Sequence, residues 1–231
     1  MAPDKLRPGS ASAITLWDST EPHMWEEALN EYNESIEIVH KNSSKAQSKL
    51  SKQSMLDDRK WIDDKLPRLL QEQKHITLAQ LERLMVWKLR RGVYRPTLMS
   101  LIRKNTDEKV QTVSKSALAI VDKTSSATKV TEACKILTQI HGVGPATASL
   151  ILSVAVPEVA PFMSDEAMDA VIGLPRAYTL PKFVKFQAAA AKKAEELGSY
   201  WNPDFVEKAL FSTAMFAKYE ISSPIKLDLM K

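Results

Sequence analysis

The segment 136–152 places two glycines, separated by one residue, between two apolar runs, although the chain has only 6 glycines in 231 residues. Glycines in this spacing let the backbone turn sharply and let another molecule approach it closely. Pro145 follows them and suits the first turn of a helix, where no proline N–H is needed. We therefore expect the backbone N–H groups near Gly142, Gly144 and Ala146 to hold one phosphate at the start of a helix.

The same segment has the spacing of a helix-hairpin-helix motif, in which two short helices are joined by a tight turn. The apolar positions from Leu137 to Leu152 fit the two helices, and the turn reads HGVG. We place the motif at residues 129–154. In the alternative interpretation the segment is only a tight helical turn in a core, but two glycines within apolar helices are otherwise costly.

A carboxylate follows the motif at Asp165, in the sequence SDEAMD. A carboxylate in a cleft can activate water or stabilise positive charge that develops on a sugar. Glu166 and Asp169 add negative charge, which repels phosphate and can raise the pKa of a neighbouring carboxyl group. In the alternative interpretation the segment only begins a helix, with Ser164 as its cap and the acidic side chains in favourable contact with the helix dipole.

The stretch 88–104 contains six basic residues and no acidic one: Lys88, Arg90, Arg91, Arg95, Arg103 and Lys104. Such a stretch indicates a basic face that binds phosphate groups, although it can also be a solvated surface. Arg83, Trp87 and Arg91 share one helix face, which predicts either a phosphate clamp with an aromatic platform or a tryptophan covered by arginine stems. Lys88 is in addition a candidate amine nucleophile, if its surroundings exclude water.

Helix signals surround these residues. Thr77 and Gln80 form a capping box at the start of a helix over 77–92, and Gly92 stands where a left-handed terminal residue is typical. Asn202 and the proline after it begin the last helix. Because alternating strand patterns are missing, we expect an all-α fold.

The chain is long enough and, with 44% hydrophobic residues, apolar enough to bury a sizeable core. We expect a flexible N-terminal tail over residues 1–21 and one α-helical domain over residues 22–231. No apolar run approaches the roughly 20 residues that cross a bilayer, so we expect no membrane partner. The first residues lack the apolar stretch of a signal peptide, which predicts an intracellular protein.

The single cysteine, Cys134, excludes an internal disulfide and a four-thiolate iron–sulfur cluster. The four histidines show no metal spacing, so no cofactor is required by the sequence. The net charge of +4 is by itself weak evidence for any class of partner. The clustering of basic residues in one stretch is more informative.

The motif and the aspartate together resemble the helix-hairpin-helix DNA glycosylase superfamily, with its endonuclease III and adenine glycosylase branches. The resemblance extends over residues 75 to 220 and is specific in the hairpin. It implies two α-helical lobes with double-stranded DNA across the cleft between them, a monomeric protein, and the nucleus as its location. The residues expected to contact DNA are Gly142, Val143, Gly144, Ala146, Thr147, Lys88, Arg90, Arg91 and Arg95.

The resemblance also assigns roles to single residues. Asp165 stands where the family has its catalytic carboxylate, next to a flipped-out nucleotide. Ala146 stands where members that cleave the strand carry a lysine, so cleavage through a Schiff base at that position is excluded. A sodium or potassium ion is implied on the backbone carbonyls of Thr138, Ile140 and Val143.

Three functions follow as hypotheses. The first is a DNA-binding protein of repair or lesion recognition, with or without activity. The second is a monofunctional DNA glycosylase that releases a damaged base, such as an alkylated purine, without lyase activity. The third is a helical protein-interaction module that binds no nucleic acid, and it differs from the others in that salt should not weaken its binding steeply.

Overall fold

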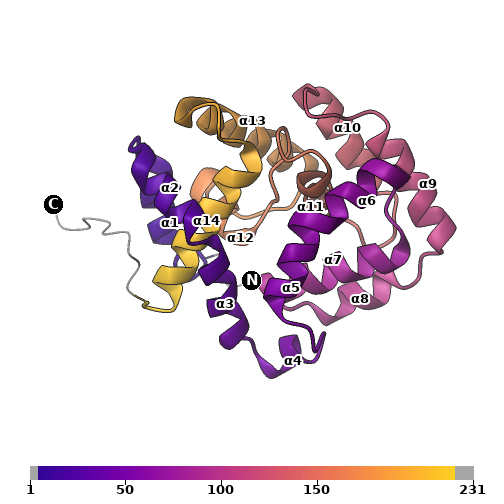
Figure 1. Ribbon diagram of the computed structural model, residues 1–231, viewed down its shortest axis with the longest axis horizontal. Coiled ribbons are helices and arrows are strands. Elements are labelled where there is room, and N and C mark those ends of the chain that lie inside the picture. The colour runs from indigo at the N-terminus through magenta and orange to yellow at the C-terminus, as the bar shows by residue number, and fades with distance from the viewer. Residues whose placement is uncertain (1–4, 222–231) are drawn as a thin grey trace.

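The computed structural model describes residues 5–221, which form helices and loops without any strand among them (Figure 1). This confirms the predicted all-α class. The helices are α1 (Ser10–Asp18), α2 (Pro22–Asn30), α3 (Tyr32–Lys41), α4 (Lys45–Ser48), α5 (Met55–Lys60), η1 (Trp61–Lys65, a π-helix), α6 (Leu66–Gln73), α7 (Leu78–Arg91), α8 (Pro96–Ile102), α9 (Asp107–Leu118), α10 (Ala127–Leu137), α11 (Pro145–Ala155), α12 (Asp165–Val171), α13 (Leu180–Leu197) and α14 (Pro203–Lys218).

Two predicted helix starts are confirmed by their hydrogen bonds. The Thr77 hydroxyl accepts from the N–H of Gln80, and the Gln80 side chain accepts from the N–H of Thr77, as a capping box requires. The Asn202 side chain accepts from the N–H of Phe205 at 2.8 Å and caps α14. Both starts depend on local residues only, which is why their sequence signals were sufficient.

The end of α7 differs from the prediction. Gly92 has φ −111°, so it is not in the left-handed conformation. The amide nitrogen of Gln47 instead donates to the carbonyls of Leu89, Arg90 and Gly92, at 3.2, 3.1 and 3.0 Å. A side chain distant in the sequence therefore satisfies the carbonyl groups that a left-handed glycine would otherwise have helped to satisfy.

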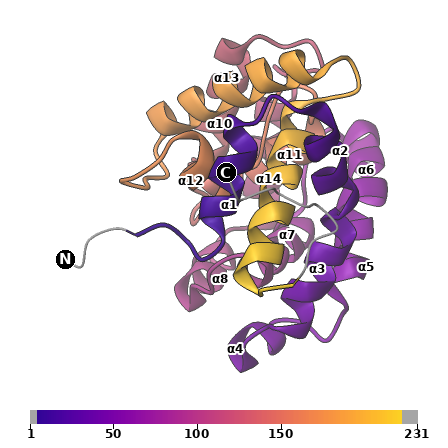
Figure 2. The ribbon, with the colours of Figure 1, turned by 90° about the vertical axis from the view of Figure 1, so that its left-hand side faces the viewer.

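The flexible tail predicted for residues 1–21 is wrong for the part of it that forms α1. This helix packs against α12 and α14 and buries Ala13 and Leu16 (Figure 2). Gly9 precedes it with φ +87°, and a side chain there would meet the carbonyl oxygen of Ala214 at 1.9 Å. Tight packing against a helix about 200 residues later orders the segment, while residues 1–4 and 222–231 lie outside the described part of the chain.

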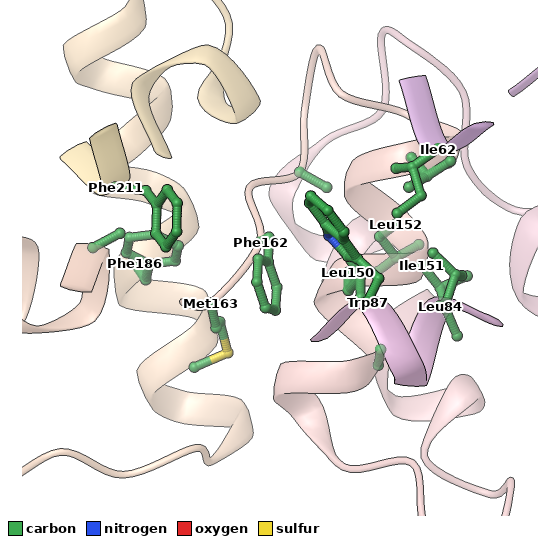
Figure 3. Packing of buried hydrophobic residues seen from close by; sticks show 14 of the residues in the cluster. Ile62, Leu84, Trp87, Leu150, Ile151, Leu152, Phe162, Met163, Phe186 and Phe211 are labelled. Carbon is green, nitrogen blue, oxygen red and sulfur yellow. The ribbon is translucent and has the colours of Figure 1, made fainter. Parts of the chain in front are cut away.

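The helices form two groups that meet along the middle of the molecule (Figure 1). In one group, α14 packs against α1, α2, α3, α12 and α13. In the other, α7 packs against α5, α8, α9 and α11. Phe162 lies between the two groups, with Phe211 of α14 on one side and Trp87 of α7 on the other (Figure 3).

A buried ion pair also joins the two groups. Arg91 on α7 donates to both carboxylate oxygens of Glu207 on α14, at 2.9 and 3.1 Å, and each side chain is 2% exposed. The guanidinium lies 3.7 Å from the ring centroid of Phe211. Although burial alone would lower the pKa of Arg91, the Glu207 carboxylate outweighs it and raises that pKa, so the arginine stays charged.

Arg90 is buried as well, in a different environment. Its side chain is 1% exposed and donates to the carbonyl of Gln53 at 2.8 Å and to Asp58 at 3.3 Å. Both guanidinium groups therefore make contacts inside the protein, and DNA-phosphate binding by Arg90 and Arg91 is not tested by these contacts and stays a prediction. Trp87 is also buried, which removes the predicted aromatic platform.

Replacing Arg91 by Met tests the structural role of this ion pair. We expect the free energy of unfolding to fall by about 3–5 kcal/mol, because Glu207 is left as a buried, unpaired carboxylate. The matched control is Arg103→Met, which removes an exposed arginine that pairs with Glu82 and should cost less than about 1 kcal/mol. Urea unfolding measures both, and similar small losses in the two variants would contradict the structural role.

Candidate functional site

The hairpin between α10 and α11 has the geometry that its glycines predict. Gly142 has φ +82°, and the side chain of Asn105 holds the turn by donating to the carbonyl of His141 at 2.8 Å and accepting from its N–H at 2.9 Å. The N–H groups of Gly142, Gly144 and Ala146 have no hydrogen-bond acceptor among the described residues. They are therefore available as donors to a ligand.

A cavity of about 140 Å³ opens beside this turn. Five hairpin residues line it on one side: Gly142, Gly144, Pro145, Ala146 and Thr147. Lys88, Arg91 and Arg95 from the end of α7 and the following loop line it on another. Its apolar and aromatic wall includes Phe162, Met163, Phe211 and Tyr178. Two carboxylates at the start of α12, those of Asp165 and Glu166, also line the cavity.

The structure thus brings together most of the predicted site residues around one cavity. Val143 is an exception within the hairpin, because it does not line the cavity and packs in the hydrophobic core instead. The carbonyl of Ile140 accepts from the N–H of Val143 at 3.0 Å, which forms part of the turn. A cation on the carbonyls of Thr138, Ile140 and Val143 is not tested by these contacts and stays a prediction.

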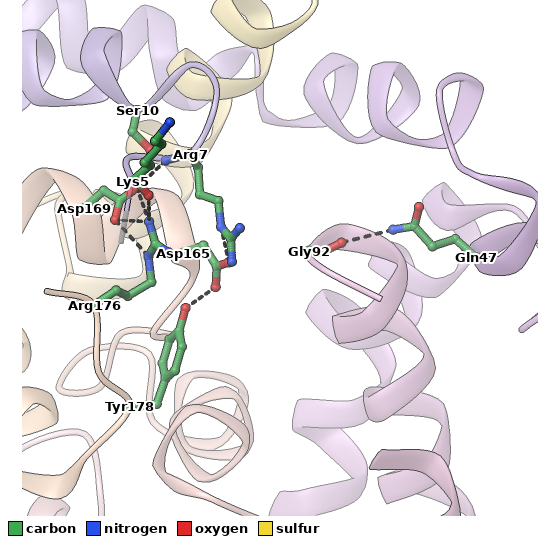
Figure 4. A network of polar contacts seen from close by, with 9 residues as sticks. All are labelled: Lys5, Arg7, Ser10, Gln47, Gly92, Asp165, Asp169, Arg176 and Tyr178. Atoms are coloured by element: carbon green, nitrogen blue, oxygen red, sulfur yellow. Dashed lines mark hydrogen bonds and ion pairs between the residues drawn. The ribbon is translucent and has the colours of Figure 1, made fainter. Parts of the chain in front are cut away.

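Asp165 is held from two sides. The guanidinium of Arg7 donates to one carboxylate oxygen, from Nε at 2.7 Å and from Nη2 at 2.6 Å. The hydroxyl of Tyr178 donates to the other oxygen (Figure 4). Ser164 makes no side-chain hydrogen bond to the start of α12, so it does not act as the predicted cap.

A second carboxylate anchors the N-terminal segment that delivers Arg7. Asp169 accepts from the N–H of Arg7 at 2.8 Å, from the hydroxyl of Ser10 at 2.9 Å and from Arg176 (Figure 4). Arg176 in turn donates to the carbonyl of Lys5 at 3.1 Å. The negative charges of Asp165 and Asp169 are therefore balanced by two arginines, which reduces the phosphate repulsion expected from the sequence.

Two titratable groups in the cavity have pKa values that are shifted toward neutral pH. Burial, followed by the positive charge of Arg95, lowers the pKa of Lys88 to about 8, although Asp165 acts in the opposite direction. Burial, followed by the charge of Asp165, raises the pKa of Glu166 to about 7. At neutral pH the cavity therefore contains an amine and a carboxyl group that can each hold or release a proton.

Sequence reasoning missed Arg7 and Tyr178. Arg7 lies 158 residues before Asp165, in a segment with many turn-forming residues, and no local pattern relates the two. Tyr178 lies in the loop after α12, where its ring faces Arg95, whose guanidinium is 5.7 Å from the ring centroid. Burial and the charge of Asp165 raise the pKa of Tyr178, so it stays a hydrogen-bond donor.

Comparison of the chain with protein-family models, with curated proteins and with solved structures found no match. Within residues 5–221, no helix is long and apolar enough to span a membrane. The same residues include no group of three or more histidine, cysteine, aspartate or glutamate side chains that is suited to hold a metal ion.

The two hairpin glycines should differ in how they affect stability. A Cβ at Gly142 would lie 2.8 Å from the Cβ of Leu101, in a left-handed backbone conformation, so Gly142→Ala should lower the free energy of unfolding by about 2–5 kcal/mol. A Cβ at Gly144 would meet no atom within 4 Å, so Gly144→Ala should cost less than about 1 kcal/mol. Urea unfolding of both variants checks this, and equal losses would show that the turn relaxes around residue 142.

Proposed function

We propose that this protein binds double-stranded DNA and takes one extrahelical nucleotide into the cavity beside the hairpin. The observation that carries the proposal is that three free backbone N–H groups of the hairpin, of Gly142, Gly144 and Ala146, lie at the same cavity as a lysine and a carboxylate. N–H groups at a helix start attract a phosphate, and a nucleotide bound there has its sugar and base within reach of the cavity. In this proposal the two groups of helices act as the two lobes of a glycosylase-like fold.

The size and lining of the cavity support this occupant. Its volume of about 140 Å³ is close to the roughly 150 Å³ of an apolar cavity that accommodates a benzene ring. One flat six-membered ring therefore fits, against Phe162 and Phe211. A monovalent cation on the carbonyls of Thr138, Ile140 and Val143 would stiffen the turn that presents the N–H groups.

Gly144→Leu is the sharpest test of DNA binding, because a Cβ at this position meets no atom within 4 Å and a longer side chain would occupy space beside the hairpin N–H groups. We expect affinity for duplex DNA to fall at least about tenfold, a loss of about 1.4 kcal/mol. The control Asn33→Leu places the same side chain on the exposed surface of α3 and should bind like the wild type. Fluorescence anisotropy with labelled duplexes measures both, and equal affinities would refute the role of the hairpin.

The salt dependence of the same binding separates DNA recognition from a protein-interaction module. A DNA binder loses affinity steeply as salt rises. Arg95 is exposed and has no ion pair among the described residues, so Arg95→Gln should weaken binding to all sequences alike and reduce the salt slope by about one. If the wild type bound no duplex at low salt, the interaction-module hypothesis would replace the proposal.

A second candidate function, DNA glycosylase activity without strand cleavage, is favoured by one specific observation. Asp165 lines the cavity, and Arg7 and Tyr178 fix the orientation of its carboxylate. A fixed carboxylate beside the sugar of the bound nucleotide would stabilise positive charge as a base departs, or activate the attacking water. A base that is already positively charged, such as an alkylated base, leaves most readily.

The test of this second candidate is base release from duplexes that carry alkylated, oxidised or deaminated bases. We expect the wild type to release an alkylated base and to leave an abasic site. Asp165→Asn should abolish release but bind DNA as well or better, because a negative charge near phosphate is lost. If neither protein releases a base from any of these duplexes, DNA binding alone is the function.

A further inference from the structure

Lys88 is the basic residue of the cavity that the proposed function leaves without a role. Its neighbour on the cavity wall, Arg91, forms an ion pair with Glu207 through Nη2. The side chain of Lys88 is partly buried and makes no hydrogen bond or ion pair with the described residues. An unpaired amine in a partly buried site is unusual for a merely structural lysine, which would be solvated or paired.

The surroundings of Lys88 favour its uncharged form. The titratable and charged groups that line the same cavity are Arg91, Arg95, Asp165, Glu166 and Tyr178. Burial and Arg95 lower the pKa of Lys88 to about 8, so about half of the side chains carry a free electron pair at that pH. Arg7 partly offsets Asp165, the one group that opposes this shift. An amine of this kind is a nucleophile toward a carbonyl carbon.

We propose that Lys88 forms an imine with the ring-opened sugar of an abasic nucleotide whose phosphate is held by the hairpin. The inference rests on the proposed function, since DNA must place the sugar in the cavity. The sugar of an abasic nucleotide opens to an aldehyde at C1′, and it lies next to the phosphate. Because Ala146 has only a methyl group and lines the same cavity, it leaves room for a side chain that reaches in from α7.

The reaction requires only groups that the cavity contains. The electron pair of the Lys88 amine forms a bond to C1′, and the carbonyl electrons move to the oxygen, which takes a proton from Glu166. The Glu166 carboxylate then takes a proton from the nitrogen and returns it to the hydroxyl group, which leaves as water while the electron pair of the nitrogen forms the C=N bond. Burial and Asp165 raise the pKa of Glu166 to about 7, which suits a proton donor at neutral pH. Hydrolysis reverses the reaction, so a reductant is needed to keep the product.

The experiment uses the full chain, sodium borohydride and a duplex with one natural abasic nucleotide. Borohydride reduces the imine to a stable amine, so we expect a covalent protein–DNA product that mass spectrometry maps to Lys88. Lys88→Met and Lys88→Arg should reduce trapping at least about a hundredfold, a typical loss when a nucleophile is removed. The control Lys115→Met, on the exposed surface of α9, should trap like the wild type. Trapping should be greatest between about pH 7 and pH 8, because the free amine of Lys88 becomes more abundant as pH rises while the protonated form of Glu166 becomes less abundant. An exposed lysine would still be charged in this range.

A second duplex distinguishes failure of this inference from failure of the proposed function. It carries a tetrahydrofuran in place of the abasic sugar, which has no aldehyde and cannot form an imine. Binding to this duplex without trapping on the natural one, or trapping that maps to another amine, would overturn the role of Lys88 and leave DNA binding intact. Absence of binding to both duplexes would overturn both. Urea unfolding of the two Lys88 variants verifies that they remain folded.

Discussion

The buried ion pair between Arg91 and Glu207 fixes α7 to α14 where the two groups of helices meet. Neither charge reaches water, so each depends on the other for its stability. The rings of Tyr32, Phe162 and Phe211 surround the guanidinium, with centroids 5.6, 5.2 and 3.7 Å away. These contacts fix the position of α7 relative to α14. The cavity beside the hairpin depends on this position, because Arg91 and Phe211 form part of the cavity wall.

The helical repeat explains why neighbouring basic residues of α7 have different roles. Residues three positions apart lie on nearly the same face of a helix, whereas adjacent residues are rotated by about 100°. Lys88 and Arg91 accordingly both line the cavity, while Arg90 turns away to Asp58 and Gln53. Within α7, the basic residues that suggested one phosphate-binding surface therefore divide into two buried arginines and one lysine at the cavity.

The N-terminal segment completes the site from the other group of helices. Arg7 pairs with Asp165, and Arg176 pairs with Asp169. Each of these four charges would be costly if it were unpaired in a partly buried site, and the pairing balances them. Gly9 permits the close approach of this segment to α14. The acidic start of α12 is therefore compatible with a bound phosphate, and the orientation of Asp165 depends on a segment that lies far from it in the sequence.

The sequence by itself determined the features that depend on neighbouring residues. Periodicity, the Thr77 and Asn202 caps and the two hairpin glycines specified the all-α class, helix starts and the turn beside Gly142, because each of these acts within a few residues of the chain. Only the tertiary structure decided which charged side chains are buried and which line the cavity. Arg91 and Glu207 are 116 residues apart, and Arg7 and Asp165 are 158 apart, so no local pattern relates them. Burial and pairing of charges arise from packing between distant helices, and they decide whether an arginine binds a ligand or holds the fold together.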